Sequence, residues 1–588
     1  MIESLYDWED SQPDEHLTEH LANSLEMPVP LTRAMINRGV TTIDTARRFM
    51  EPCYSDLHDP WLFLDMDRAA GRIVQALRDH ERILVLGDYD VDGITSTAML
   101  VHFIESRGGH VKYYIPDRLT EGYGLSMQVL DKAKKAQYDL IITVDTGIGS
   151  TDEARYAAEL GIDLIITDHH EHRDNLPPAL AVVNPKRSDA RYPFRGLAGV
   201  GVALKLVLAV ADMLKLDMEE ILDEYIEFVA LGTVADLVPM LDENRFLVRR
   251  GLSKMNRSRN LGLYSLLEVS HIREEERLDT THVSFRMAPR PNAAGRLWKS
   301  RAGVELLLAR SPGRARELAR ELDRKNRQRI QEEAGIFESA VEQLNRSHNL
   351  PEDRVIVLHD DSWHIGVIGI VASKIMERYH RPVLFATVSG KPEDIANPHP
   401  EKGRIFQGSA RSFKGFDLYA ALSECSDILL AYGGHKLAAG IKVYENDIPE
   451  LRSRLNKLAG DLIGNGDYRR RLLIDSELPL SQANRKFLFK GLALEPCGIG
   501  NLKPVFCASR VTVVQSRAVG ADGAVLKLKL GQGNTVQDAV GFGMCKYFNP
   551  EKLSNELLDI VFDIQQDNFG GRSGVSLKLK DLRLSGIN

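Results

Sequence analysis

Three aspartates occur at alternate positions in one short segment of the sequence. Asp88, Asp90 and Asp92 lie within residues 87–93, directly after the apolar run at residues 83–86. Carboxylates this close repel one another unless cations neutralise them, so the spacing predicts a divalent metal site. A plain acidic turn, in which one aspartate caps the following helix, is the alternative interpretation.

Two more apolar runs end in residues of the types that can bind metals. Residues 140–144 and 163–167 have the length and composition of buried strands within a repeating strand and helix pattern. The residues that close these runs are Asp145, Asp168, His169 and His170. Because right-handed crossovers keep such strands parallel, their carboxyl ends share one edge of a sheet and the side chains converge. Oxygen ligands with one or two imidazoles suit Mn²⁺ or Mg²⁺ better than zinc.

The elements that must position these residues divide the chain into several domains. At 588 residues the chain is too long to fold around a single hydrophobic core, and about three or four domains are expected. After an N-terminal extension at 1–45, residues 46–310 are expected to form an α/β domain with a parallel sheet. A long charged helix at 311–348, most of its charges solvated, leads to a second α/β domain at 349–455. Residues 456–588 alternate with period two between glycine turns, which predicts a small antiparallel barrel.

Composition limits the classes of function. The net charge is −8, so nucleic-acid binding would have to rest on local basic patches. Five scattered cysteines without a CxxC pair argue against disulfides and zinc. The first residues lack a basic and apolar leader, and no apolar run approaches the roughly 18 residues of a membrane span. We therefore expect a cytoplasmic protein without a membrane partner.

Four motifs give the sequence a family resemblance. Residues 88–93, 144–147, 168–170 and 232–236 resemble the successive motifs of the DHH phosphoesterase superfamily. The last of these motifs ends at Asp236, which a turn at a helix C-terminus would explain equally well. Longer strings resemble the bacterial RecJ family of single-strand-specific DNA exonucleases, and they lie at 116–118, 121–125, 288–290, 292–296, 364–373, 408–412 and 433–440. The last string is the hallmark of the DHHA1 domain, and the resemblance runs in order from about residue 45 to the C-terminus.

The resemblance implies a fold and a two-metal site. It implies a parallel-sheet DHH domain, a long helix, a DHHA1 domain and an OB-type barrel. One ion would be held by Asp90 and Asp145, and the other by Asp92, Asp145, His169 and Asp236, with Asp145 bridging. Asp88 and His170 would lie beside the ions, and Asp168 would orient the histidines. Many relatives place a histidine four residues before Asp90, where this chain has Leu86. The first ion is therefore expected to be bound more weakly, or to be completed by Asp88 and water.

The resemblance also implies groups that hold the substrate. Arg118, Ser409 and Arg411 would hold the 5′-phosphate end, and Arg290, Arg296 and His435 would lie near the scissile group. Asn292 would also bind substrate. Gly433 and Gly434 are expected to form a flexible turn where the backbone approaches a phosphate. On the barrel, Lys527, Lys529 and Phe542 are candidate contacts to single-stranded DNA. A lysine in a strand more often simply lies on the solvent-exposed face of the sheet.

The function that follows is hydrolysis of single-stranded DNA from the 5′ end to 5′-mononucleotides, in DNA repair and recombination, with two Mn²⁺ or Mg²⁺ ions. A cleft between the two α/β domains would exclude duplex DNA. Single-strand-binding protein and a helicase are expected partners besides the DNA. One alternative is a DHH phosphodiesterase that acts on short oligoribonucleotides or cyclic dinucleotides. The other is a catalytically inactive, replication-associated DNA-binding protein.

Overall fold

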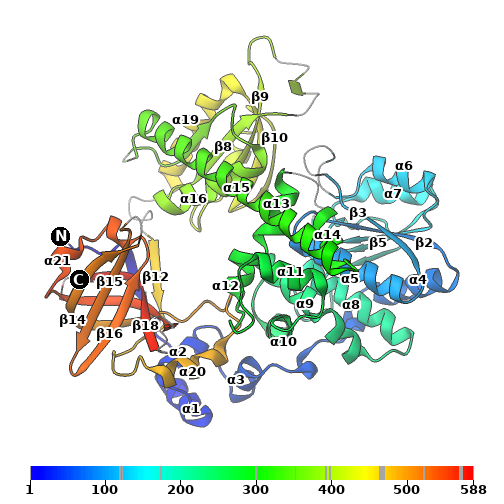
Figure 1. The fold of residues 1–588 in the computed structure, drawn as a ribbon. Coiled ribbons are helices and arrows are strands. Elements are labelled where there is room, and N and C mark those ends of the chain that lie inside the picture. Colours follow the sequence, from blue (N-terminus) through cyan, green and yellow to red (C-terminus); the bar gives the residue numbers. More distant parts are fainter. Residues whose placement is uncertain are drawn as a thin grey trace.

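The computed structural model places three compact bodies around the long helix α15 (Pro312–Ser347) and the N-terminal helices (Figure 1). It describes residues 2–117, 121, 124–172, 175–297, 301–350, 352–390, 394–395, 399–462, 470–520, 523–567 and 574–586. In Figure 1 the first α/β domain lies on the right, the second at the top and the barrel on the left. No helix in these ranges is both long enough and apolar enough to cross a membrane.

The first domain contains the predicted parallel sheet. Its strand order is β3-β2-β4-β5-β6, and every pairing is parallel. The strands are β2 (Arg82–Gly87), β3 (His110–Tyr114), β4 (Leu140–Val144), β5 (Asp163–Thr167) and β6 (Ala181–Val183). The order reverses beside β2, and ligands of open parallel sheets bind where the strand order reverses. The prediction of an α/β domain with a parallel sheet is confirmed.

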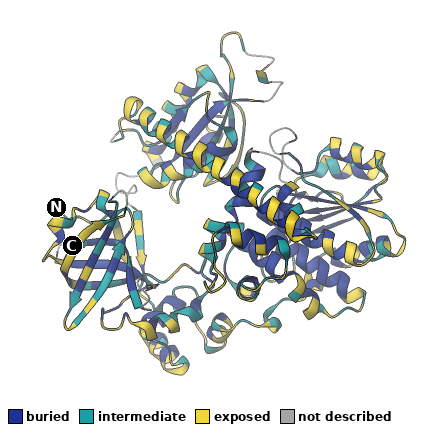
Figure 2. Ribbon diagram, viewed as in Figure 1, coloured by how far each residue is buried: buried dark blue, intermediate teal, exposed yellow. Residues whose placement is uncertain are grey.

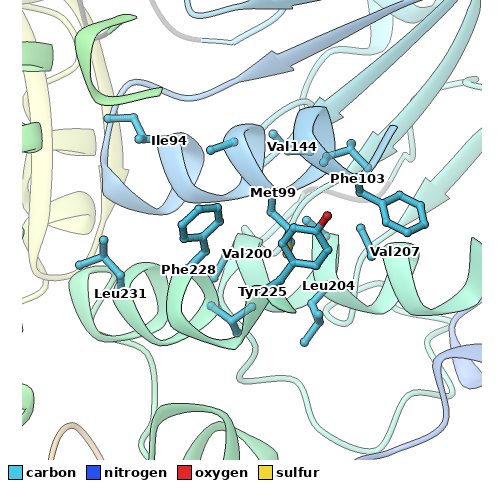
Figure 3. Close-up of a cluster of buried hydrophobic side chains, with 14 of the residues drawn as sticks. Ile94, Met99, Phe103, Val144, Val200, Leu204, Val207, Tyr225, Phe228 and Leu231 are labelled. Carbon is cyan, nitrogen blue, oxygen red and sulfur yellow. The ribbon is translucent and has the colours of Figure 1, made fainter. Parts of the chain in front are cut away.

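Helices cover both faces of this sheet because its strands are apolar on both sides. One face packs on α4 (Met66–Arg78), α5 (Val91–Ser106) and α8 (Gly199–Met213), with α9 (Met218–Ala235) packed behind α5 and α8, and the other face packs on α6 (Met127–Lys135) and α7 (Thr151–Glu159). Figure 3 shows Ile94 and Met99 of α5 beside Tyr225 and Phe228 of α9. These buried helices are apolar nearly all round, which fixes the start of α5 relative to the sheet.

The rest of the domain is helical and leads into α15. The elements are α10 (Asp242–Met255), α11 (Leu261–Val269), α12 (Thr280–His282), the π-helical turn η3 (Val283–Met287), α13 (Pro289–Leu297) and α14 (Arg301–Leu307). The first half of α15 buries Leu318 and Leu322 in the first domain, and the second half buries Ile336 and Leu344 in the second. Figure 2 shows α15 with one buried and one exposed side, as the predicted solvated charges require.

The second domain is built on a mixed sheet with the order β10-β11-β9-β8-β7. Its elements are β7 (Ile356–His359), α16 (Ile365–Tyr379), β8 (Val383–Val388), β9 (Ile405–Arg411), α18 (Leu418–Ser423), β10 (Leu429–His435), β11 (Ala438–Tyr444) and α19 (Ile448–Leu462). The prediction of a flexible turn at Gly433 and Gly434 is wrong. Both glycines lie in β10 and pair with Gly440 and Ala439 of β11, because cross-strand pairing overrides the weak strand preference of glycine.

The C-terminal region forms a closed barrel. Five strands, β14 (Phe506–Val519), β15 (Val525–Gln532), β16 (Thr535–Gly541), β18 (Gly574–Leu584) and β17 (Leu557–Asp567), follow one another around it, and β14 pairs with β17 to close it. The predicted barrel is confirmed, with one difference. The β16 and β18 pairing is parallel, whereas the other pairings between these five strands are antiparallel.

The N-terminal extension packs against this barrel. β1 (Tyr6–Asp10) pairs in parallel with β12 (Arg470–Ile474), and α1 (Glu15–Leu25), α2 (Val29–Ile36) and α3 (Ile43–Met50) follow. Leu31 and Met35 belong to the same hydrophobic core as Phe506. The buried carboxylate of Asp581 accepts hydrogen bonds from Ser4 Oγ at 2.7 Å and from the indole of Trp8 at 2.8 Å. Both ends of the chain therefore lie at the barrel (Figure 1).

Candidate metal centre

The loop between β2 and α5 positions the first two candidate ligands. Asp90 is the N-cap of α5, and its Oδ1 accepts hydrogen bonds from the backbone N–H groups of Asp92 at 3.0 Å and Gly93 at 3.1 Å. The helix-capping interpretation is therefore confirmed for Asp90. Because the cap uses one carboxylate oxygen, it also fixes the direction of the whole group. Asp88, Asp90 and Asp145 offer ligand atoms that all lie within 4.8 Å of one another.

Asp92 is held at the N-terminus of a second helix. Its two oxygens accept hydrogen bonds from the N–H groups of Gly199, at 2.7 Å, and Val200, at 2.8 Å, in the first turn of α8. A Cβ atom at Gly199 would lie 2.6 Å from the Cβ of Asp145, and a Cβ at Gly232 would lie 3.0 Å from Asp92 Oδ1. The close approach of α8 and α9 to the carboxylates therefore requires glycine at both positions.

His169 lies among three carboxylates. Its Nε2 is 3.1 Å from Asp145 Oδ1, 3.5 Å from Asp236 Oδ2 and 3.9 Å from Asp92 Oδ2. This buried nitrogen makes no hydrogen bond with any residue that the structure describes. A buried imidazole nitrogen that faces carboxylate oxygens without a hydrogen bond is the donor arrangement that a divalent cation completes.

Electrostatics explain why a cation belongs here. Burial raises the pKa of Asp145 well above its ordinary value, and the charge of Asp92 raises it further. Burial, followed by the charge of Asp90, raises the pKa of Asp236 to about 7. Burial lowers the pKa of His169 to about 3, so its imidazole is neutral and able to donate a lone pair. The residues therefore fit divalent ions. Asp145 offers a ligand atom to two groups, one with Asp88 and Asp90 and the other with His169 and His170, and a third group consists of Asp92, His169 and Asp236.

Asp168 orients both histidines. Its Oδ1 lies 2.7 Å from the backbone N of His169 and 2.7 Å from Nδ1 of His170, and its Oδ2 accepts from the N–H of Ile148 at 2.9 Å. Burial alone would lower the pKa of His170, but its hydrogen bond to Asp168 and the surrounding carboxylates raise it. His170 therefore keeps a proton more readily than His169, as the chemistry of a hydrogen-bond donor requires.

Leu86 lies where many relatives are expected to have a histidine. It is completely buried, and its side chain belongs to the apolar cluster beneath α6 and α7. Asp236, the fourth expected acid, is the C-cap of α9, with its N–H bonded to the carbonyl of Gly232 at 2.9 Å. The helix-end interpretation of Asp236 is therefore confirmed; its Oδ2 lies 3.5 Å from His169 Nε2, and its role as a metal ligand stays a prediction.

Helix α13 connects the metal centre with the second domain. Asn292 Oδ1 accepts a hydrogen bond from the N–H of Val91 at 3.0 Å, beside the Asp90 cap. One turn later, Arg296 Nη1 lies 3.5 Å from the carbonyl oxygen of Gly366 at the start of α16. Arg290 is 9% exposed, and its Nε donates to Asp323 of α15 at 3.0 Å. The expected role of Arg290 at the scissile group stays a prediction.

The candidate phosphate-binding residues lie on β9 and β10. Arg411 Nη1 donates to Ser409 Oγ at 2.8 Å. A Cβ atom at Gly369 of α16 would lie 2.8 Å from Arg411 Nη2, so this glycine lets the helix pack against the guanidinium. His435 ends β10 and is exposed. Arg118, the third expected phosphate ligand, lies outside the described residues.

The barrel candidates lie on its outer face. Lys527 pairs with Arg517 on one side and with Val540 on the other, while the alternate residues of β15 are buried in the barrel core. Lys529 follows on the same side of the strand. Phe542 is 62% exposed, with the ammonium of Lys578 at 5.8 Å from its ring centroid.

Comparison with known proteins gives three matching family models. The N-terminal domain of the DHH family matches residues 82–233, the DHHA1 domain matches 352–461 and the RecJ OB domain matches 474–581. These ranges coincide with the parallel sheet and its first helices, the second α/β domain and the barrel.

Similar proteins cover almost the whole chain. The single-stranded-DNA-specific exonuclease RecJ of Bacillus subtilis is 36% identical over 585 residues, which are 100% of this chain and 72% of that protein. The enzyme of the same name from Escherichia coli is 33% identical and covers 95% of this chain and 96% of its own. A crystal structure of Thermus thermophilus RecJ with Mn²⁺ has a TM-score of 0.81 at 29% identity, covering 99% of this chain and 80% of that one. Its complex with Mg²⁺ has a TM-score of 0.76 at 27% identity, covering 99% of this chain and 79% of that one.

Proposed function

Since the chain belongs to the RecJ family of exonucleases, we propose that it hydrolyses single-stranded DNA from the 5′ end and releases 5′-mononucleotides. The observation that carries the proposal is the convergence of Asp92, Asp145, His169 and Asp236, from four separate segments, around one buried point. An inactive DNA-binding protein would have no need of buried carboxylates that destabilise one another without a cation.

The side chains divide into two ligand sets. Asp90 and Asp145 would hold one Mn²⁺ or Mg²⁺ ion, and Asp92, Asp145, His169 and Asp236 the other. When bound, such a pair supplies an activated water and Lewis acid stabilisation of the phosphodiester and its leaving oxygen. Asp168 keeps His170 oriented and protonated, so His170 donates a hydrogen bond to an oxygen of the reacting phosphate. Gly199 and Gly232 let the helices approach closely enough to keep the carboxylates in place.

The second domain supplies the 5′ end of the site. Ser409 and Arg411 hold the terminal phosphate, and Arg118 completes the set. A guanidinium and a hydroxyl side by side grip a phosphate in a defined orientation. Helix α13 contacts both Val91 and Gly366, so it fixes the distance between this phosphate site and the metal centre. A fixed distance of this kind makes the enzyme release one nucleotide at a time. His435, Arg290 and Arg296 act near the scissile group.

A nuclease assay on the full chain tests this function. With Mn²⁺, we expect a labelled single strand to release 5′-mononucleotides, and a strand with a 5′-hydroxyl in place of the phosphate to react more slowly. A blunt duplex should be spared, and a chelator should stop the reaction. Faster hydrolysis of a cyclic dinucleotide or a short oligoribonucleotide than of the long strand would favour the other DHH activity and refute the proposal.

We further propose that the protein acts in the cytoplasm, in DNA repair and recombination, with single-strand-binding protein and a helicase as partners. The support is chemical, because a helicase supplies the single strand that the site accepts and a binding protein covers it. Rates measured with each partner added to the strand test this. An unchanged rate on partly duplex DNA after addition of a helicase would contradict the coupling.

A further inference from the structure

A cavity of about 440 Å³ lies between the first domain and the chain that leads into the barrel. Its wall includes the end of α9, the turn η3 and the segment 495–503. Val234, Leu237 and Val238 line it, and Asp236 stands among them in the sequence. The cavity therefore begins at the residue next to a candidate metal ligand.

The side chains in the cavity are apolar and unusually exposed. Phe285 is 76% exposed, Leu502 66%, Leu237 60% and Ile499 49%. Leu237 has φ +59°, a left-handed conformation that a leucine adopts only when the surrounding structure enforces it. Four apolar side chains gathered in one concave site indicate a ligand with apolar faces.

Cations outnumber carboxylates on the same wall. Arg249, Arg277 and Lys503 line the cavity with Asp279 and Glu495. Arg277 Nη2 contacts Glu495 Oε2 at 2.9 Å, and Lys503 is exposed. The excess of cationic side chains on this wall contrasts with the acidic metal centre nearby. Such cations can bind the phosphates of a strand whose bases enter the apolar part of the cavity.

The wall is held in place from both sides. Thr280 Oγ1 donates to the carbonyl of Cys497 at 2.7 Å, and the N–H of Met240 donates to the carbonyl of Ile499 at 2.7 Å. The buried guanidinium of Arg245 in α10 donates to the carbonyl of Pro496 at 3.1 Å. A site with such walls is formed before the ligand arrives, which lowers the cost of binding.

We propose that this cavity holds nucleobases of the single strand on the 3′ side of the scissile phosphate, with Phe285 as the stacking surface. The inference rests on the proposed function and assigns a subsite to it. Ser409 and Arg411 take the 5′ side of the strand, in the second domain. A strand with its reacting phosphate at Asp236 therefore passes the adjacent Leu237 with the nucleotides that follow. Aromatic rings bind every base because every base has a flat face, so the site does not select a sequence.

The test compares Phe285→Ala with Phe489→Ala in the full chain with Mn²⁺. Phe489 is 51% exposed on α20 (Arg485–Gly491) and does not line the cavity. Initial release of the first nucleotide is measured on long 5′-phosphorylated strands that carry one abasic residue at successive positions. In the wild type, kcat/KM should fall when the abasic residue lies a few nucleotides from the 5′ end.

Phe285→Ala should raise KM and so lower kcat/KM on the intact strand by about 5- to 150-fold, which is the range for the loss of one stacking ring. It should also abolish the position-dependent abasic effect, whereas Phe489→Ala keeps both wild-type values and Phe285→Tyr restores stacking. Circular dichroism confirms that each variant is folded. If Phe285→Ala retains the wild-type KM and abasic profile, the inference is overturned and the cavity serves another ligand, such as a peptide. If the wild type does not cut single strands at all, the proposed function itself fails.

Discussion

Replacing Asp236 by asparagine should stabilise the metal-free protein while it removes activity. Burial and the charge of Asp90 raise the pKa of Asp236 from 3.8 to about 7. The unfolded chain therefore loses this proton near pH 4, and the folded chain keeps it until about pH 7. Stability is lost as the pH rises through that window, because the folded state binds the extra proton. A pKa shift of about three units, at about 1.36 kcal/mol per unit, lowers the free energy of unfolding by at most about 4 kcal/mol above pH 7.

The assay is urea denaturation of wild type and Asp236→Asn between pH 4 and pH 8, first with a chelator and then with Mn²⁺. Without metal, the variant should gain in denaturation midpoint relative to the wild type as the pH rises, and the two should coincide at pH 4. Added Mn²⁺ should reverse the order, because the ion stabilises only the protein that binds it tightly.

Asp168→Asn is the matched control. Hydrogen bonds and the charge of His170 lower the pKa of Asp168 despite its burial, so its loss should destabilise the protein at neutral pH. If Asp236→Asn is less stable than the wild type at pH 8 without metal, the argument that the ionised Asp236 carboxylate lowers stability when no cation is bound is refuted.

Three more substitutions test the site. Asp145→Ala should abolish hydrolysis with an unchanged circular dichroism spectrum, because it removes the ligand shared by both ions, and near-normal turnover would contradict the bridging role. Gly199→Ala should reduce kcat by a factor of about ten or more, because its Cβ would lie 2.6 Å from that of Asp145, while Gly313→Ala, which meets nothing within 4 Å, should leave the rate unchanged. Equal rates for these two variants would refute the packing argument. Leu86→His should lower the Mn²⁺ concentration for half-maximal activity, and an unchanged Mn²⁺ titration would show that position 86 does not reach the first ion.

One expectation failed because strand pairing overrides the preference of the residue type. Gly433 and Gly434 look like a turn by residue type, yet pairing with β11 draws them into a strand. Arg290 is expected near the scissile group by resemblance, and that role stays a prediction; its hydrogen bond to Asp323, a partner more than thirty residues away, is a contact that residue type does not reveal. Asn292 shows a contact that residue type does not reveal, since it holds the N–H of Val91. Gly199 could not be identified as a packing residue from the sequence, where it is only a small residue at the start of an apolar helix.

The strand-ending aspartates, the parallel sheet and the meeting of Asp92, Asp145 and His169 at one sheet edge could be predicted from the residue pattern, whereas Asp236, at the end of helix α9, was expected only from the family resemblance. Hydrophobic periodicity is local, and the handedness of crossovers then leaves one edge where these side chains meet. Only the tertiary structure decided that the N-terminal extension packs on the barrel, with Asp581 binding Ser4 and Trp8, and that three distant segments enclose the cavity at Phe285. Such contacts depend on shape and on burial between segments hundreds of residues apart, which no local pattern encodes.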